Sequence, residues 1–175
     1  MKPILFSTEM VRAILDGRKT MTRRVVKPQH YRKPRYQTGD ILWVRETWSV
    51  QEDLPYDNYV YRSDYGTTEH DSFPPSMFKW RPSIHMPKEA ARIFLCVTDV
   101  RVERVQDILC GDMKREGCIP ETVTGGQYQQ WHRDYWIPLW DSINDKRGYP
   151  WSSNPWVWVY SFKRCDKPET LEAVQ

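Results

Sequence analysis

The sequence lacks the features that place a chain in a membrane or in an oxidising compartment. Its apolar runs cover only a few residues, far fewer than the roughly 20 that a membrane-spanning helix needs. The start of the chain soon becomes charged, so we expect no signal peptide. No Cys-x-x-Cys pair occurs among the four cysteines, which are Cys96, Cys110, Cys118 and Cys165. We therefore expect a reduced, cytoplasmic protein with no membrane partner.

Signatures of bound metals and nucleotide cofactors are also missing. None of the four histidines stands at a metal-ligand spacing from a cysteine, so we expect no zinc site. Neither a phosphate-binding loop nor a dinucleotide fingerprint occurs. The sequence therefore predicts no metal and no cofactor.

What the chain does have is enough length for one domain and an uneven charge. It has 175 residues, of which 28% are charged and 39% are hydrophobic, a composition typical of an ordered domain. Residues 1–36 carry ten Lys or Arg and two acidic residues, a net charge of +8, whereas the rest of the chain carries −5. A basic block of this kind predicts an anionic partner or, as the alternative, only a solvated basic face.

Apolar spacing predicts a mixture of short helices and strands. Helices are expected over residues 7–16, 111–116 and 127–144, and strands over 19–26, 41–48, 59–62, 92–105 and 155–163. Ser7 suits the N-cap of the first helix and Gly17 its left-handed end, while Pro138 should break or restart the last helix. The fold class we predict is α+β, a small, partly closed β-barrel of about five to six strands with helices packed around it.

We expect one domain over residues 1–165, with an insertion at about 50–90 and a peripheral tail over 166–175. The segment 63–90 is rich in Pro, Ser, Asp and aromatic residues. It is predicted to be a long loop, ordered in part by its aromatic side chains.

The densest polar cluster is Gly17-Arg-Lys-Thr-Met-Thr-Arg-Arg24, between a predicted helix and a predicted strand. In a strand, Thr22 and Arg24 point to one side and Arg23 to the other, and a turn can swing Lys19 to join Thr22. Crowded cations lower each other's pKa, so Lys19 can act as a base and the Thr22 hydroxyl as a nucleophile. Arg24 can hold a phosphate or carboxylate with its forked donors. The alternative is a basic loop that only contacts phosphates or solvent.

Glu116 is a second candidate, because the helix dipole disfavours a carboxylate at a helix C-terminus. Asp112 stands four residues earlier and adds like-charge repulsion. A residue placed against local preference can mark function. The alternative is that a nearby arginine neutralises it.

Aromatic residues on two predicted strands are candidates for stacking. Trp43 and Arg45 share a strand face, which suits a base stacked beside a charge, with core packing as the alternative for Trp43. The stripe formed by Trp156, Trp158, Tyr160 and Phe162 is expected to be core, because both faces of that strand are apolar, with a base-stacking platform as the alternative.

The pattern Gly17-x-Lys19-x-x-Thr22-x-Arg24 resembles the signature of ASCH-domain proteins, which belong to the PUA-like superfamily. Thr38-Gly39-Asp40 before a strand and the helix end Arg115-Glu116-Gly117 are similar to the same family. The sequence also resembles the longer ASCH-like proteins of bacteriophages and prophages, at Trp43–Trp48, Pro82–Met86, Leu139–Asn144 and Asn154–Trp158. The resemblance to the minimal domain covers residues 1–50 and 92–163, and it implies a PUA-like β-barrel.

Within that superfamily, the spacing is similar to that of an amidohydrolase that removes acetate from 4-acetylcytidine. The resemblance implies that Thr22 attacks the amide carbonyl or positions the attacking water, and that Lys19 acts as a base and then stabilises the oxyanion. Glu116 would orient Lys19 or carry a proton to the leaving amine. The expected substrate-binding residues are Arg24, Arg23, Arg45 and Trp43.

Two alternatives come from other classes of protein. The same residues predict an RNA- or DNA-binding module that recognises a single base, modified or not, without catalysis or with nuclease activity. A third hypothesis is a phage accessory protein that binds a host protein through an exposed Trp/Tyr surface. The expected partner is a modified nucleoside or single-stranded nucleic acid.

Overall fold

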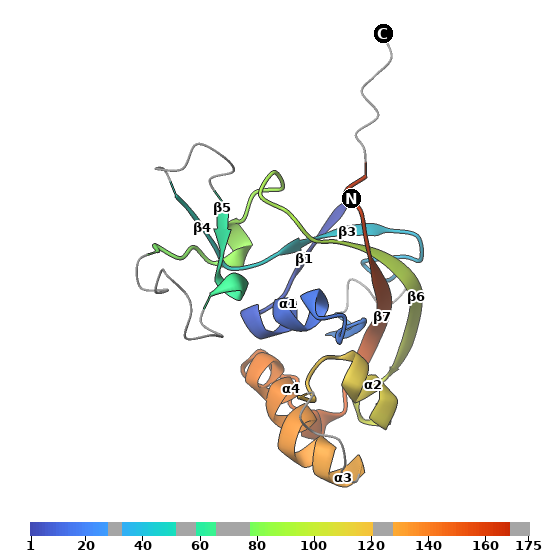
Figure 1. Ribbon diagram of the computed structural model, residues 1–175. Helices are drawn as coiled ribbons and strands as arrows, with labels where there is room; N and C mark the ends of the chain where they lie inside the picture. Colours follow the sequence, from blue (N-terminus) through green and yellow to red (C-terminus); the bar gives the residue numbers. More distant parts are fainter. Residues whose placement is uncertain (28–32, 52–58, 66–77, 121–127, 169–175) are drawn as a thin grey trace.

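The computed structural model describes residues 1–27, 33–51, 59–65, 78–120 and 128–168 (Figure 1). The strands are β1 (Lys2–Leu5), β2 (Met21–Val25), β3 (Ile41–Arg45), β4 (Trp48–Val50), β5 (Tyr59–Tyr61), β6 (Phe94–Arg104) and β7 (Trp156–Cys165). The α-helices are α1 (Thr8–Leu15), α2 (Cys110–Arg115), α3 (Tyr128–Trp131) and α4 (Ile137–Asn144), and a π-helix (His132–Trp136) joins α3 to α4.

The main sheet has five strands in the order β1-β3-β6-β7-β2. β1 runs parallel to β3, and the other neighbours are antiparallel. The long strands β6 and β7 form its curved centre (Figure 1). The two edge strands approach each other, because Arg24 of β2 donates a hydrogen bond of 2.8 Å to the carbonyl of Leu5 at the end of β1. The predicted α+β fold with a partly closed, five-stranded sheet is therefore confirmed.

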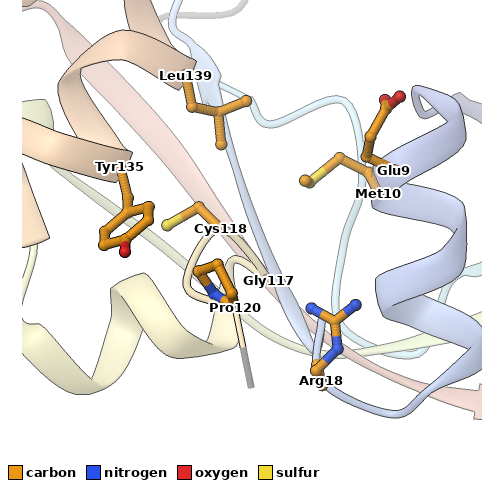
Figure 2. Close-up of a pocket in the computed structure, with 8 residues that line it drawn as sticks. All are labelled: Glu9, Met10, Arg18, Gly117, Cys118, Pro120, Tyr135 and Leu139. Carbon is orange, nitrogen blue, oxygen red and sulfur yellow. The ribbon is translucent and has the colours of Figure 1, made fainter. Parts of the chain in front are cut away.

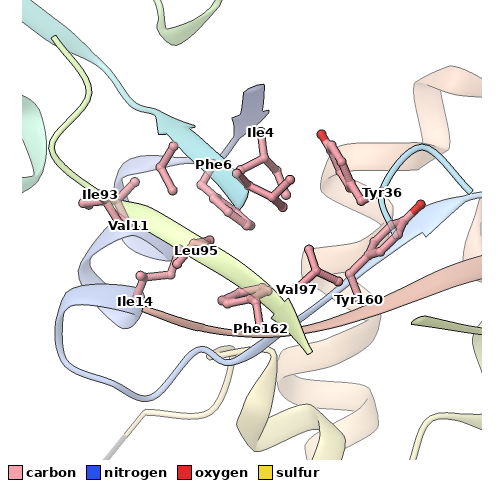
Figure 3. Close-up of a cluster of buried hydrophobic side chains, with 12 residues drawn as sticks. Ile4, Phe6, Val11, Ile14, Tyr36, Ile93, Leu95, Val97, Tyr160 and Phe162 are labelled. Atoms are coloured by element: carbon pink, nitrogen blue, oxygen red, sulfur yellow. The ribbon is translucent and has the colours of Figure 1, made fainter. Parts of the chain in front are cut away.

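The two faces of β7 belong to different cores. Tyr160 and Phe162 lie in a first cluster with side chains of α1 (Figure 3), whereas Val157 and Val159 pack against the segment from α2 to α4. The expected core stripe is thus confirmed for Tyr160 and Phe162. It is wrong for Trp156, which is 45% exposed, because the start of β7 extends beyond the first cluster.

The prediction of one strand over residues 41–48 is wrong. β3 ends at Arg45, and β4 pairs with β5 in a separate two-stranded sheet. The reason is Glu46, which is only 1% exposed. Its carboxylate accepts hydrogen bonds from Arg92 at 3.0 Å and from Ser63 at 2.5 Å. A buried carboxylate needs such partners, and the chain leaves the sheet where they are found.

Several local predictions are confirmed. Ser7 caps α1 by accepting a hydrogen bond from the Met10 amide at 3.4 Å, and Gly17 has a φ of 77°. Pro138 lies in the first turn of α4, so the helix restarts there after the π-helix. β1 was not predicted, because a short edge strand that contains a proline shows little alternation.

The segment around residues 50–90 is partly ordered by aromatic contacts, as expected. The rings of Tyr65, Phe78 and Trp80 pack together with centroid distances between 4.8 and 5.7 Å. Phe73, another aromatic residue of the segment, lies outside the described residues, and so does most of the predicted tail. The assignment of residues 1–165 to one domain stays a prediction.

Candidate active site

Lys19 is held where the end of α1 meets the loop that follows α2. After Gly17 ends the helix, the Lys19 amide donates to the carbonyl of Ala13 at 2.8 Å. On the other side lies Gly117, which has a φ of 74°. A Cβ on Gly117 would stand 2.8 Å from the Cβ of Ala13 and 2.9 Å from that of Lys19. Only glycine fits there, so the two loops pack directly against each other.

The Lys19 ammonium is buried and donates to three oxygens. It lies 2.9 Å from Oε2 of Glu116, 2.7 Å from the carbonyl of Glu116 and 2.8 Å from that of Met21. The two side chains of the pair are 2% and 5% exposed. Burial lowers the pKa of Lys19, and the charge of Glu116 opposes that effect. Lys19 is therefore part of a buried ion pair in which all three ammonium hydrogens are used.

Arg23 binds the other carboxylate oxygen of Glu116. Its guanidinium lies 3.1 Å from Oε1 of Glu116, 2.7 Å from Asp112 and 2.5 Å from Glu103. Burial alone would lower the pKa of Arg23, but Glu116 and Glu103 outweigh burial and raise it. The unfavourable placement of Glu116 and Asp112 on α2 is thus explained by ion pairing. The pKa of Lys19 is lowered mainly by burial, and the nearby charge of Arg24 adds to that effect.

Thr22 and Arg24 lie on the opposite face of β2. Thr22 stands opposite Tyr160 of β7 in the strand register, and Thr22 is 3% exposed. Arg24 lies over the ring of Phe6, 5.3 Å from its centroid, and the Lys19 ammonium lies 5.5 Å from the same centroid. Lys19 and Arg24 thus share the Phe6 ring, but no hydrogen bond joins Lys19 to Thr22 among the described residues, so their joint action stays a prediction.

Trp43 and Arg45 lie elsewhere in the sheet. Both are on β3, which β6 and β7 separate from β2. Trp43 is 8% exposed and packs with Phe94 and Met86. The guanidinium of Arg45 lies 5.4 Å from the Trp43 ring centroid and donates to the carbonyl of Ile84. The structure does not bring these two residues to Lys19.

A pocket of about 290 Å³ lies between α1, the loop after α2 and the helical segment that carries Tyr135 (Figure 2). It is lined by Glu9, Met10, Arg18, Gly117, Cys118, Pro120, Tyr135 and Leu139. Arg18 and Gly117 are the sequence neighbours of Lys19 and Glu116, but Lys19, Thr22 and Glu116 do not themselves line the pocket. Reasoning from the sequence did not identify Tyr135, because nothing in the pattern predicts the π-helix that carries it.

Cys118 is a pocket residue with suppressed reactivity. Burial, together with the charge of Glu116, raises the pKa of its thiol from 9.0 to about 12. Its Sγ lies 3.1 Å from the carbonyl of Met113. Because the thiolate is the nucleophilic form, Cys118 contributes shape to the pocket rather than chemistry.

In the parts of the chain that are described, no three His, Cys, Asp or Glu side chains come together as metal ligands would. Within the same residues, no helix has the length and apolar character needed to cross a bilayer.

Fold and site together define a small α+β protein with a buried lysine–glutamate pair beside a pocket. Its fold is similar to that of protein EF3133 from Enterococcus faecalis V583, of family model DUF984. The TM-score is 0.53 at 10% identity, over 95% of this chain and 77% of that one. The ASCH domain from Lactobacillus crispatus JV V101 superposes with a TM-score of 0.45 at 11% identity, over 89% of this chain and 69% of that one. No family model and no curated protein matches the sequence. The likeness to the Enterococcus protein concerns the fold alone.

Proposed function

We propose that this protein hydrolyses the amide bond of an N-acylated cytosine nucleoside of the 4-acetylcytidine type. The observation that carries the proposal is the contact of 2.9 Å between Lys19 Nζ and Glu116 Oε2, from residues 97 positions apart. A buried lysine with a lowered pKa beside a pocket is typical of functional sites. The pair also occupies the positions that the ASCH-like motif assigns to catalysis.

The pair offers a route for the protons of amide hydrolysis. A proton passes from the Lys19 ammonium to Glu116, which leaves a neutral amine and a neutral acid. The amine takes the proton of the Thr22 hydroxyl, or of a water beside it, as that oxygen bonds to the acyl carbon. The regenerated ammonium stabilises the oxyanion. Glu116 then protonates the leaving amine as the C–N bond breaks. If Thr22 is the nucleophile, water hydrolyses its ester in a second step.

Chromatography of reactions with 4-acetylcytidine tests the proposal. The wild-type protein should release cytidine, and Lys19→Ala should release none. Because Lys19→Ala leaves Glu116 buried without its lysine, a second variant is needed that keeps the ion pair. Thr22→Val should abolish product, while Thr22→Ser, which keeps the hydroxyl, should retain part of it. A folded wild-type protein that forms no cytidine would overturn the proposal, as would a fully active Thr22→Val.

A second candidate function is a nucleic-acid-binding module that recognises a single base. Arg24 favours it, because the guanidinium contacts a carbonyl oxygen and a ring rather than a carboxylate. Much of the basic block favours it less, since Lys2, Arg18 and Arg23 are paired with acids. Binding that weakens steeply with salt would support this candidate. For either function we propose a cytoplasmic ASCH-like protein of the phage type, as the sequence resemblance implies.

A further inference from the structure

The register of three strands puts Arg24 at one end of an aromatic row. Arg24 of β2, Trp158 of β7 and Val102 of β6 stand directly opposite one another. Two residues further along each strand, Trp156 stands opposite Arg104. Paired residues and those two apart point to the same face of a sheet. The face that carries Thr22 and Arg24 in the candidate active site therefore continues into these side chains.

At this end the face is hollowed and open. A hollow of about 220 Å³ is lined by Val26, Val102, Trp156 and Trp158. Val102 is 49% exposed and Trp156 is 45% exposed. An exposed indole in an apolar hollow is a typical feature of surfaces that bind a planar group.

Arg104 places a positive charge beside the hollow. Its guanidinium lies 4.3 Å from the Trp156 ring centroid and donates to the carbonyl of Asn154 at 2.9 Å. Among the described residues this guanidinium forms no ion pair, whereas Arg23 on the opposite face contacts three carboxylates. The Arg24 guanidinium is not part of the hollow, because it lies over the Phe6 ring and donates to the carbonyl of Leu5. The charge of Arg104 is thus complementary to an anion.

We propose that this hollow binds an unpaired nucleotide of single-stranded nucleic acid. The base would stack on Trp156, and a neighbouring phosphate would meet Arg104. A base in a duplex is already stacked on both sides, so a double strand does not offer the face that Trp156 needs. The site stands on different observations from the hydrolysis proposed above, and it deepens the second candidate function by naming the residues that would bind the nucleic acid.

Fluorescence anisotropy with a labelled single-stranded RNA, and with the matching DNA, tests this site. Trp156→Ala should weaken binding about five- to a hundredfold, the range expected for loss of one stacked base. Trp156→Phe keeps a stacking ring and should retain most of the affinity. Arg104→Gln should weaken binding and make it less dependent on salt, by about one unit of log–log slope. Arg115→Gln, whose side chain is 63% exposed on α2, is the matched control and should bind as the wild type does.

Three outcomes would overturn the proposal: no binding of either strand, unchanged binding by Trp156→Ala in a folded protein, or equally tight binding of the duplex. The readout is binding rather than turnover. A protein that fails to release cytidine can therefore still pass this test, and one that fails it can still be a hydrolase.

Discussion

Glu116 binds two cations at once, one on each oxygen of its carboxylate. Lys19 lies on Oε2 and Arg23 on Oε1, and both cations come from the same short motif. A carboxylate held in this way is fixed in orientation, which suits a group that accepts a proton and returns it. Arg101 extends the cluster, because its guanidinium contacts both Glu103 and Asp112.

Arg23→Met should strongly destabilise the protein, because it leaves three carboxylates with one fewer partner in a buried site. Breaking a buried ion pair from one side costs about 3–5 kcal/mol. The control is Arg18→Met, since Arg18 and Asp16 form a pair at the surface, and such pairs contribute about 0–1 kcal/mol. Urea unfolding measures both free energies. Equal losses for the two variants would show that the cluster does not support the fold.

The thiol of Cys118 should resist alkylation up to unusually high pH. With its pKa raised from 9.0 to about 12, the reactive thiolate forms late, although the residue lines a pocket. Iodoacetamide labelling followed by mass spectrometry gives the pH of onset, with urea-unfolded protein as the control. The group stabilises the fold below pH 9, and that contribution is lost as the pH rises toward 12. Labelling of the native protein with onset near pH 9 would contradict the described burial.

At the scale of elements, local patterns were enough for α1, β6 and β7, whose apolar spacing and end signals lie within each segment. They failed at the junction of β3 and β4, because the break depends on Arg92 and Ser63, which meet Glu46 only in the folded chain. The short stretch of sequence around Glu46 contains neither of these partners. The parallel strand β1 was missed for a related reason, because its backbone pairs with β3, which lies in a different part of the sequence.

The close packing of the α1 end against the loop after α2 makes Gly117→Ala costly. Its Cβ would clash with those of Ala13 and Lys19, which adds about 1–3 kcal/mol to the cost of a left-handed φ. Gly148→Ala is the matched control, because Gly148 has a φ of 83° with nothing within 4 Å, so only about 1–2 kcal/mol is expected. Thermal or urea unfolding compares the two. If Gly148→Ala proves as damaging as Gly117→Ala, the packing described here is wrong.

In the molecule as a whole, the sheet places Thr22 and the aromatic hollow on one face, whereas Glu116 lies with Arg23 on the other. Local chemical signals marked Lys19 and Glu116 as separate candidates, and only the resemblance to ASCH-domain proteins paired them. The exposure of Trp156 could not be predicted, since it depends on where β7 extends beyond the first core. A base that reaches Thr22 would therefore lie on the same sheet face as the hollow, where neighbouring nucleotides of the same nucleic-acid chain can also bind.

The most direct test is the reaction of the wild-type protein with a short single-stranded RNA that contains one 4-acetylcytidine, followed by mass spectrometry of the strand. We predict that the acetyl group is removed by the wild-type protein, more slowly by Trp156→Ala and not at all by Thr22→Val. A folded wild-type protein that leaves the acetyl group in place, both on this strand and on the free nucleoside, would contradict the assignment of Lys19, Thr22 and Glu116 as a hydrolytic site.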